Sequence, residues 1–484
     1  MNTDILIENV PAVKVGQKKY LVYAPYKKVF IELPLDQLSN SDKIAELKRT
    51  GLFDFPKFAL HAEKSIRIVL NITNKCNFVC KYCWAKSSPK RTEVMSPQTA
   101  RNIVSELSVS QKINRIHFMG GEPTLNIETI KAVVSYFVEN KISPLPIFYL
   151  TSNGALAQDK LDWLIRNKFV FSISWDGIGK AHDDQRPLSG NKESERIVRE
   201  TIIKIIRDNN ILLRVRMTIS KMNLPYLYES VGWLADNGVK YIHIEPVSPD
   251  GRGIEYAKNN SVIPKEFVNE FFRIVDLAEE KQVWLMNSSL ANLYTPRDYF
   301  CSALKHKVYN FNPDGSISQC YKVQNINDPL ATKFVIGEYN DKWGVINIDR
   351  FKSNKLSAMS VSDNKDYKDF YLKYIYSGGC PYKSNICQSN KIGNITDNIN
   401  IKLLRRAILH IYKRAISGQN SVLEGYLHFY GMIEGINEKK NRINRTNESM
   451  GTFKKSEKDN IKIIPILIKA KNQYIGIDAC DICI

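Results

Sequence analysis

The sequence predicts an α/β fold in which six parallel strands form a partial (β/α)6 barrel of the TIM-like kind. Apolar, strand-like runs alternate regularly with helix-like segments from about residue 66 to residue 247. The strand-like runs are 66–72, 115–119, 146–150, 169–174, 212–219 and 241–247. The helix-like segments lie near 97–109, 126–140, 157–167, 193–209 and 225–237. Strands that alternate with helices of this length form right-handed strand–helix–strand units and hence a parallel sheet.

The most unusual short segments of the chain directly follow these strands. A group of three cysteines follows the first strand, and GGEP (120–123) follows the second. TSNG (151–154) follows the third strand, SWDG (174–177) follows the fourth, and EPVSPDGRG (245–253) closes the sixth. In a parallel barrel, active sites are built at the carboxyl ends of the strands. The distribution therefore predicts an active site on that face.

Composition and charge limit the class of protein and its partners. The chain of 484 residues contains no apolar run that could span a bilayer and no signal-peptide pattern, so we expect a cytoplasmic protein that does not bind membranes. Lys and Arg (69) exceed Asp and Glu (50), which gives a formal charge of +19. Such an excess favours an acidic peptide or, as a less favoured alternative, RNA. Part of the excess lies in residues 439–458, which we interpret as a solvated linker.

Changes in the sequence pattern divide the chain into four parts. Residues 1–62 contain an apolar run at 18–33 that predicts a hairpin, followed by a helical segment. Residues 63–262 contain the predicted barrel. Residues 263–397 begin with a helix, continue with a hairpin around an Asn-Pro-Asp-Gly turn, and end in a loop-rich region. Residues 398–484 contain two predicted helices, the basic linker and a strand-like end.

Cys76, Cys80 and Cys83 have the spacing C-x3-C-x2-C after the first predicted strand. A cytoplasmic chain is not expected to pair its nine cysteines as structural disulfides, and their grouping favours metal ligation. Three thiolates on one loop can bind a [4Fe–4S] cluster, which normally takes four protein thiolates. With three, one iron keeps an open position where a substrate can bind. Zinc is the alternative, although His61 and His117, the nearest histidines in the sequence, lie before and within strands.

At these residues the chain resembles the radical S-adenosylmethionine (SAM) enzymes. The cysteine spacing carries the resemblance, together with Tyr82 before the third cysteine and the strand-end segments over about residues 64–250. It implies that Cys76, Cys80 and Cys83 hold a catalytic [4Fe–4S] cluster whose open iron binds SAM. It also implies that reductive cleavage of SAM yields a 5′-deoxyadenosyl radical, which abstracts hydrogen from the substrate. The electron would come from a flavodoxin- or ferredoxin-type donor.

The resemblance further implies that polar and small residues at the strand ends contact SAM. Besides Tyr82, they are Gly120, Gly121, Glu122, Ser152, Asn153, Ser174 and Asp176. The Gly-Gly-Glu motif contacts the SAM amino group, the residues of TSNG reach the ribose, and those of SWDG lie beside the methionyl carboxylate. An alternative for the last four residues is that they only cap helices or turns.

The chain also resembles radical SAM maturases of ribosomally made peptides, which carry an auxiliary iron–sulfur domain of the SPASM or twitch type. The segments 174–190, 244–253, 300–320 and 376–383 carry this resemblance. It implies metal-binding roles for the thiols of Cys301, Cys320, Cys380 and Cys387.

The chain departs from the full SPASM pattern in its late motif, which is usually C-x2-C-x5-C-x3-C. With Cys380 as the last cysteine, the other three positions are Tyr367, Phe370 and Tyr376. We therefore expect one auxiliary [4Fe–4S] cluster at most. The alternative is that the aromatic side chains fill the space of lost clusters and the remaining thiols are buried small residues.

The resemblance implies an enzyme that abstracts hydrogen from a precursor peptide or protein and forms a crosslink or an epimerised residue. Residues 1–62 would help to bind the leader peptide. Two alternatives are a radical SAM enzyme that modifies RNA and a non-catalytic iron–sulfur protein. Cys480 and Cys483 could bind metal, form a redox pair, donate a hydrogen atom or have no function.

Overall fold

The computed structural model contains two sheets, one of eleven strands and one of five. It describes residues 4–7, 10–38, 40–51, 53, 65–208, 210–301, 305, 308–367, 370–383, 385, 393–438 and 462–466. Cys387, Cys480 and Cys483 lie outside the described residues. None of the helices in the described part of the chain has the length and apolar character that a bilayer crossing requires.

Seven parallel strands form the barrel, and consecutive strands are neighbours. Six of them match the predicted runs: β5 (Ser65–Thr73), β6 (Lys112–Gly120), β7 (Ile147–Ser152), β8 (Val170–Ser174), β9 (Leu213–Ile219) and β10 (Tyr241–Pro246). The seventh, β11 (Trp284–Met286), pairs in parallel with β10 and was not predicted, because three residues are too few to show alternation. The α/β class and the partial barrel are thus confirmed.

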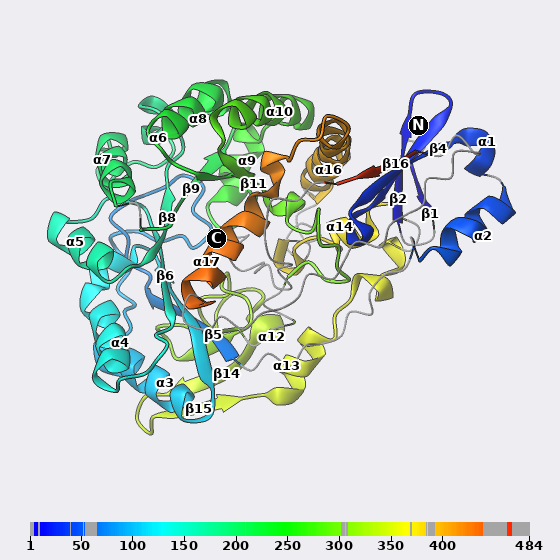
Figure 1. Cartoon of the computed structure of the whole chain (residues 1–484). Helices are drawn as coiled ribbons and strands as arrows, with labels where there is room; N and C mark the ends of the chain where they lie inside the picture. Colours follow the sequence, from blue (N-terminus) through cyan, green and yellow to red (C-terminus); the bar gives the residue numbers. More distant parts are fainter. Residues whose placement is uncertain are drawn as a thin grey trace.

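Five helices connect these strands and cover the outer face of the sheet (Figure 1). They are α3 (Pro97–Ser110), α4 (Ile127–Glu139), α5 (Gln158–Arg166), α7 (Glu195–Ile206) and α8 (Leu227–Asp236), close to the predicted positions. Each turns apolar residues toward the sheet, as α3 does with Ile103 and Leu107. Its start is fixed by Pro97 at the first position and by Ser96, whose hydroxyl accepts from Thr99 N.

The barrel sheet continues past β5 with strands from the following region. β12 (Val308–Phe311) pairs in parallel with β5, and β13 (Ser316–Ser318), β14 (Val335–Asn340) and β15 (Val345–Ile348) add in antiparallel order. The predicted hairpin is present, since β12 and β13 flank the turn that contains Gly315 (φ +83°). Its attachment to β5 joins this region to the strand that precedes the three cysteines.

The N-terminal part is an antiparallel sheet of β1 (Ile5–Ile7), β2 (Val10–Val15), β3 (Lys19–Ala24) and β4 (Val29–Pro34), followed by α1 (Leu35–Leu38) and α2 (Ser41–Arg49). The β3–β4 hairpin and the helical segment after it confirm the prediction. Alternate residues face opposite sides: Val22 and Ile31 belong to a small core with α2, whereas Tyr23 and Phe30 join the main core. The fifth strand, β16 (Lys462–Pro465), comes from the far end of the sequence.

Three long helices follow β10 in the sequence: α10 (Pro264–Lys281), α16 (Gly393–Ile416) and α17 (Gly425–Glu438). The first was predicted, but α16 begins earlier than expected, and residues 422–424 form a separate turn before α17. Buried aromatic side chains of α17 lie against the barrel face that the connecting helices leave open. Arg115 of β6 lies 5.7 Å from the Tyr430 ring and Arg214 of β9 lies 5.5 Å from the Phe429 ring.

Candidate functional site

Cys76, Cys80 and Cys83 lie on one loop after β5, residues 74–88, here called the cysteine loop. Residues 185–188, which follow the fourth barrel strand, hold the loop through its backbone. The amide of residue 79 donates to the carbonyl of residue 187 (2.9 Å), and the amide of residue 81 donates to that of residue 185 (2.9 Å). The loop conformation is therefore fixed by contacts from another strand end.

Arg252, in the segment after β10, holds the other side of the cysteine loop. Its Nε donates to Cys80 O (2.8 Å), its Nη1 to Ser87 O (2.9 Å), and its backbone N to Cys83 O (2.9 Å). The preceding Gly251 lies so close that a Cβ on it would stand 2.1 Å from the carbonyl oxygen of residue 84. Sequence reasoning noted this segment but did not single out Arg252, because an arginine in a loop carries no distinctive pattern.

The three thiols of the cysteine loop lie near one another. Cys76 and Cys80 are buried, and Cys83 is half-buried. Burial raises the pKa of Cys76, and the neighbouring Cys80, Glu122 and Cys83 raise it further. Among the described residues, no three His, Cys, Asp or Glu side chains surround a single metal-ion position. Thiolates that bind different iron atoms of one cluster need a wider spacing than ligands of a single ion.

Gly120 and Gly121 allow the turn after β6 to approach the cysteine loop. A Cβ on Gly120 would lie 2.1 Å from Thr73 O, and one on Gly121 would lie 2.2 Å from Lys75 O. Gly120 also has φ +148°, a conformation that other residues rarely adopt. Both glycines are thus required by the backbone packing of the cysteine loop, and their contact with SAM stays a prediction.

Glu122 is fully buried and joins the strand ends of β6 and β7. Its Oε1 accepts from the Thr124 amide (3.1 Å), the Thr124 hydroxyl (2.7 Å) and the Ser152 hydroxyl (3.0 Å), and its Oε2 accepts from Asn153 N (2.7 Å). Burial raises the pKa of Glu122, and these hydrogen bonds oppose the rise. Asn153 Nδ2 lies 3.6 Å from Cys76 Sγ. The structure therefore brings three predicted SAM contacts together beside a predicted cluster ligand.

Asp176 is the centre of a second buried network, which contacts the cysteine loop through Tyr82. It accepts from the Tyr82 hydroxyl and from Thr218 N (2.9 Å), and Arg186 Nη1 donates to the same Tyr82 hydroxyl (2.8 Å). Burial raises the pKa of Asp176, and the charge of Arg186 lowers it. Ser174, two residues earlier, is half-buried at the end of β8. Sequence reasoning did not single out Arg186.

Several buried polar atoms around the cysteine loop have no hydrogen-bond partner within the described residues. They include Ser87 Oγ on the loop itself, His182 Nε2, Arg186 Nε and Arg252 Nη2. The guanidinium charges of Arg186 and Arg252 both act on Cys80, where they oppose the effect of burial on its pKa. Cationic donors of this kind fit an anionic thiolate-bound cluster, because a buried charge needs a partner of opposite sign.

The auxiliary cysteines also come together. Burial raises the pKa of Cys320, and the nearby thiols of Cys380 and Cys301 raise it further. These three are therefore neighbours although they are far apart in sequence. The fourth predicted ligand, Cys387, lies outside the described residues.

The aromatic residues at the positions of the missing SPASM cysteines pack on one another. The ring centroid of Tyr367 lies 5.8 Å from that of Phe370 and 5.9 Å from that of Tyr376, and the last two rings are 6.0 Å apart. Rings at this distance are in van der Waals contact, so the side chains fill the space between these three positions.

Residues next to the two cysteine groups in the sequence contact each other in the structure. Trp84 follows Cys83 and Tyr321 follows Cys320, and their rings meet edge to face at 5.6 Å. The Lys322 ammonium lies 5.8 Å from the Trp84 ring. The predicted radical and auxiliary sites are thus adjacent.

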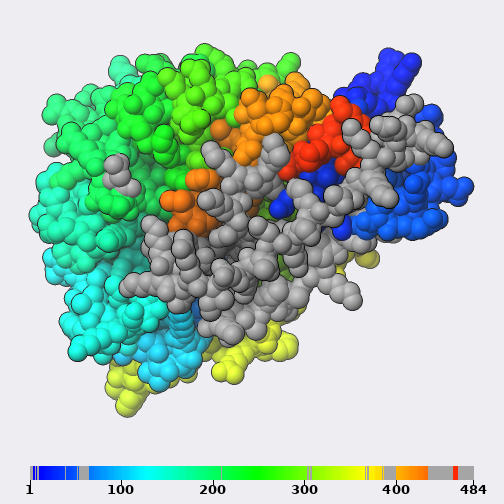
Figure 2. Space-filling view, viewed as in Figure 1, coloured from blue at the N-terminus to red at the C-terminus, as the bar shows by residue number. Residues whose placement is uncertain are grey.

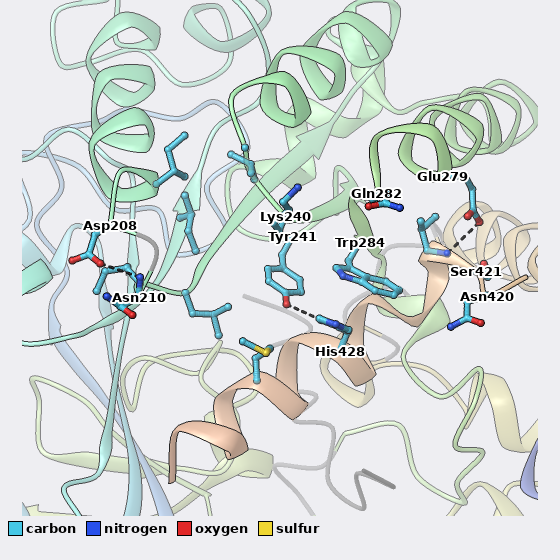
Figure 3. A pocket seen from close by; sticks show the side chains of 18 of the residues that line it. Asp208, Asn210, Lys240, Tyr241, Glu279, Gln282, Trp284, Asn420, Ser421 and His428 are labelled. Atoms are coloured by element: carbon cyan, nitrogen blue, oxygen red, sulfur yellow. Dashed lines mark hydrogen bonds between the residues drawn. The ribbon is translucent and has the colours of Figure 1, made fainter. Parts of the chain in front are cut away.

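A cavity of about 1000 Å³ lies at the opposite, amino ends of β9, β10 and β11. In Figure 3, Tyr241 and Trp284 at strand starts and His428 of α17 line it, with the Tyr241 hydroxyl 2.7 Å from His428 Nδ1. None of its lining residues is a cysteine or a predicted SAM contact. This position excludes it as the site of the predicted chemistry, which lies at the carboxyl ends.

Comparison with known proteins gives one family match and several relatives. The Radical SAM superfamily model matches residues 70–211. Protein MJ0907 of Methanocaldococcus jannaschii is 26% identical over 310 residues, which cover 63% of this chain and 96% of that protein. The radical SAM cyclopropyl synthase TigE of Paramaledivibacter caminithermalis is 27% identical over 194 residues, 36% of this chain and 39% of TigE.

The subtilosin biosynthesis protein AlbA of Bacillus subtilis is 25% identical over 224 residues, 45% of this chain and 46% of AlbA. The chain thus spans less than half of TigE and AlbA, and the relatives also include GTP 3′,8-cyclases. The solved structure of native anSMEcpe with bound AdoMet superposes with a TM-score of 0.55 and is 16% identical in sequence. The superposition covers 72% of this chain and 99% of the anSMEcpe chain, so the two share the fold. The family match, the barrel and the cysteine loop at the carboxyl ends of its strands identify residues 70–211 as a radical SAM domain.

Proposed function

We propose that this protein is a radical SAM enzyme that abstracts hydrogen from a ribosomally made peptide or protein. The observation that carries the proposal is the cysteine loop itself. It places three thiols beside a buried carboxylate at the carboxyl ends of neighbouring strands, and no fourth cysteine lies on the loop. In the proposal, Cys76, Cys80 and Cys83 hold a [4Fe–4S] cluster with one iron open to SAM.

The two buried networks that contact the cysteine loop suit the two ends of SAM. Glu122 accepts three hydrogen bonds at Oε1 and one at Oε2, so Oε2 retains acceptor capacity for an ammonium group. Ser152 and Asn153 are positioned by the same carboxylate and would face the ribose. Ser174 and Asp176 would border the methionyl carboxylate, with Tyr82 completing this side.

A cluster held by Cys76, Cys80 and Cys83 would supply the one-electron chemistry that reductive cleavage of SAM requires. The residues of this chain position the reactants in this proposal. Arg186 and Arg252 place two positive charges at the cysteine loop and stabilise an anionic cluster. Buried aromatic residues of α17 pack on the barrel near the amino ends of its strands, at the end away from the proposed site.

Three features support a peptide substrate rather than RNA. The relative AlbA is named for the biosynthesis of a bacteriocin. Cys301, Cys320 and Cys380 lie together next to the radical site, as an auxiliary cluster of a maturase requires. The small N-terminal sheet supplies a separate surface on which a leader peptide could bind, and we assign that role to residues 1–62. A cytoplasmic location and a flavodoxin- or ferredoxin-type electron donor belong to the same proposal.

Anaerobic reconstitution with iron and sulfide, followed by reduction in the presence of SAM, tests the proposal. We expect 5′-deoxyadenosine and about eight irons per chain, four for each of two clusters. Cys80→Ala should abolish SAM cleavage and remove about four irons. Cys320→Ala is the matched control, because it should also remove about four irons but keep SAM cleavage. Cleavage by Cys80→Ala equal to that of the wild type would refute the assignment of the cysteine loop.

The substrate class is tested by adding candidates to the active enzyme. Transfer of deuterium from a labelled peptide into 5′-deoxyadenosine, together with a mass change in the peptide, supports a peptide maturase. Deuterium transfer from labelled RNA alone would overturn the peptide assignment and leave the radical mechanism in place.

A further inference from the structure

The edge of the N-terminal sheet is occupied by a strand from the other end of the chain. The sheet order is β1-β2-β3-β4-β16, and β16 runs antiparallel to β4. Ile464 lies opposite Phe30 and Ile463 lies opposite Ile31. Figure 1 and Figure 2 show β16 (red) between the N-terminal sheet (blue) and the C-terminal helices (orange). An added edge strand satisfies the backbone groups of β4, which would otherwise be unpaired.

Only alternate side chains attach β16 to the rest of the molecule. Ile464 is 5% exposed and Ile466 is 2% exposed, and both join the main core. The other residues of β16 face solvent: Ile463 is 39% exposed, and Lys462 and Pro465 are exposed as well. The strand is therefore held by backbone pairing and by two isoleucine side chains.

The sequence around β16 has the character of a tethered peptide. Residues 439–461 connect it to α17, and between 439 and 458 they contain seven basic and two acidic residues. A segment joined to its binding site by a polar linker acts at high effective concentration and competes with any free peptide for the same site.

We infer that the outer edge of β4 is a docking edge for an extended peptide and that β16 is a tethered strand which this peptide must displace. The inference rests on the proposed function in that the incoming peptide is taken to be part of the substrate. The edge selects a strand antiparallel to β4 with apolar side chains at alternate positions, as in Ile464 and Ile466.

A charged position adds to this selection. Glu32 of β4 lies opposite Lys462, and its side chain also accepts from Lys19 Nζ (2.9 Å) and from the Tyr412 hydroxyl. Burial raises the pKa of Glu32, but the hydrogen bonds from Tyr412 and Lys19 lower it below its usual value, with a smaller contribution from the charge of Lys462. A docking peptide with a basic residue two positions before its first buried apolar residue therefore reproduces the contacts of β16.

A peptide with the sequence of residues 460–468, NIKIIPILI, is the probe. With the full-length protein, a fluorescein-labelled copy should bind the Ile464→Asp and Ile466→Asp variants at least about ten-fold more tightly than the wild type, because both substitutions release β16. Ile463→Asp is the matched control on the same strand and should bind like the wild type. A copy of the probe with Asp at the two buried positions should bind none of them. Equal affinity of all four proteins for the unmodified probe would overturn the inference.

Hydrogen exchange on the wild type gives a second test that needs no variant. Saturating unlabelled probe should speed exchange in residues 462–466 of the protein while residues 29–34 stay protected. No change in either segment at saturation overturns the inference. Formation of 5′-deoxyadenosine without probe is measured on the same samples, because its absence refutes the proposed function and leaves the docking result standing.

Discussion

Replacement of Arg252 by alanine tests whether the cysteine loop is held in place by the segment after β10. The side chain makes two charge-assisted hydrogen bonds to carbonyl groups of that loop, at 2.8 and 2.9 Å. Hydrogen bonds that involve a charged group contribute about 1.5–3 kcal/mol each. The substitution removes both and leaves two carbonyl groups without this partner, so we expect the free energy of unfolding to fall by about 3 kcal/mol or more.

Two measurements on the cluster-free protein detect this loss. Urea unfolding gives the change in free energy, and hydrogen exchange locates it, because amides of residues 76–88 should exchange faster in Arg252→Ala. Arg252→Lys should lose less, since an ammonium can retain one of the two contacts. Iron bound after reconstitution should fall in the order wild type, Arg252→Lys, Arg252→Ala.

Arg91→Ala is the control, because Arg91 forms an ion pair with Glu93 in which both side chains are partly exposed. Exposed pairs contribute about 0–1 kcal/mol. The reasoning is refuted when Arg252→Ala and Arg91→Ala show the same unfolding free energy and the same exchange in the cysteine loop.

Three further substitutions test other contacts. Gly121→Ala would place a Cβ 2.2 Å from Lys75 O in the cysteine loop, so we expect the reconstituted variant to lose about four irons, as Cys80→Ala should. Burial raises the pKa of Glu245, but a hydrogen bond from His243 and nearby basic groups hold it well below its usual value. The ionised Glu245 side chain therefore stabilises the folded protein above pH about 4.3, the pKa of an unfolded glutamate. This stabilisation is lost as the pH falls through the lower pKa of the folded state. Glu245→Gln should therefore lower stability at pH 7 by about 1–3 kcal/mol and flatten the acid limb of stability measured by urea unfolding. Tyr426→Phe removes a hydroxyl 3.2 Å from His243 Nε2 and should cost about 1 kcal/mol in the same assay.

The barrel and the cysteine loop could be predicted because local sequence determines them. Strand and helix patterns depend on residues a few positions apart, and the Gly-Gly-Glu and cysteine motifs lie directly after strands. Parallel strands then bring these motifs to one face without further information. Glu122 and Asn153 were recognised in this way, and their hydrogen bond of 2.7 Å confirms that they lie together.

Contacts between distant segments could not be predicted by the same means. Arg186 and Arg252 are common residues in loops, and only the folded chain reveals that both charges act on Cys80. The four residues of β16 carry no signal that they pair with β4, because β-strand pairing over such a separation depends on tertiary structure. Helix α17 was predicted as a helix, but its burial against the inner face of the barrel was not.

The aromatic substitutions in the auxiliary region limit how many clusters the chain can hold. In a two-cluster domain, the positions of Tyr367, Phe370 and Tyr376 would each direct a thiolate toward iron. Here each ring contacts the other two at 5.8 to 6.0 Å, so the rings occupy the space between these positions. Truncating Tyr376, the buried one of the three, to alanine would open a cavity in a packed group rather than restore a ligand, at a cost of about 3–5 kcal/mol. The packed rings therefore supply no ligand at these three positions, and the neighbouring thiols of Cys301, Cys320 and Cys380 are the described residues from which we propose one auxiliary cluster.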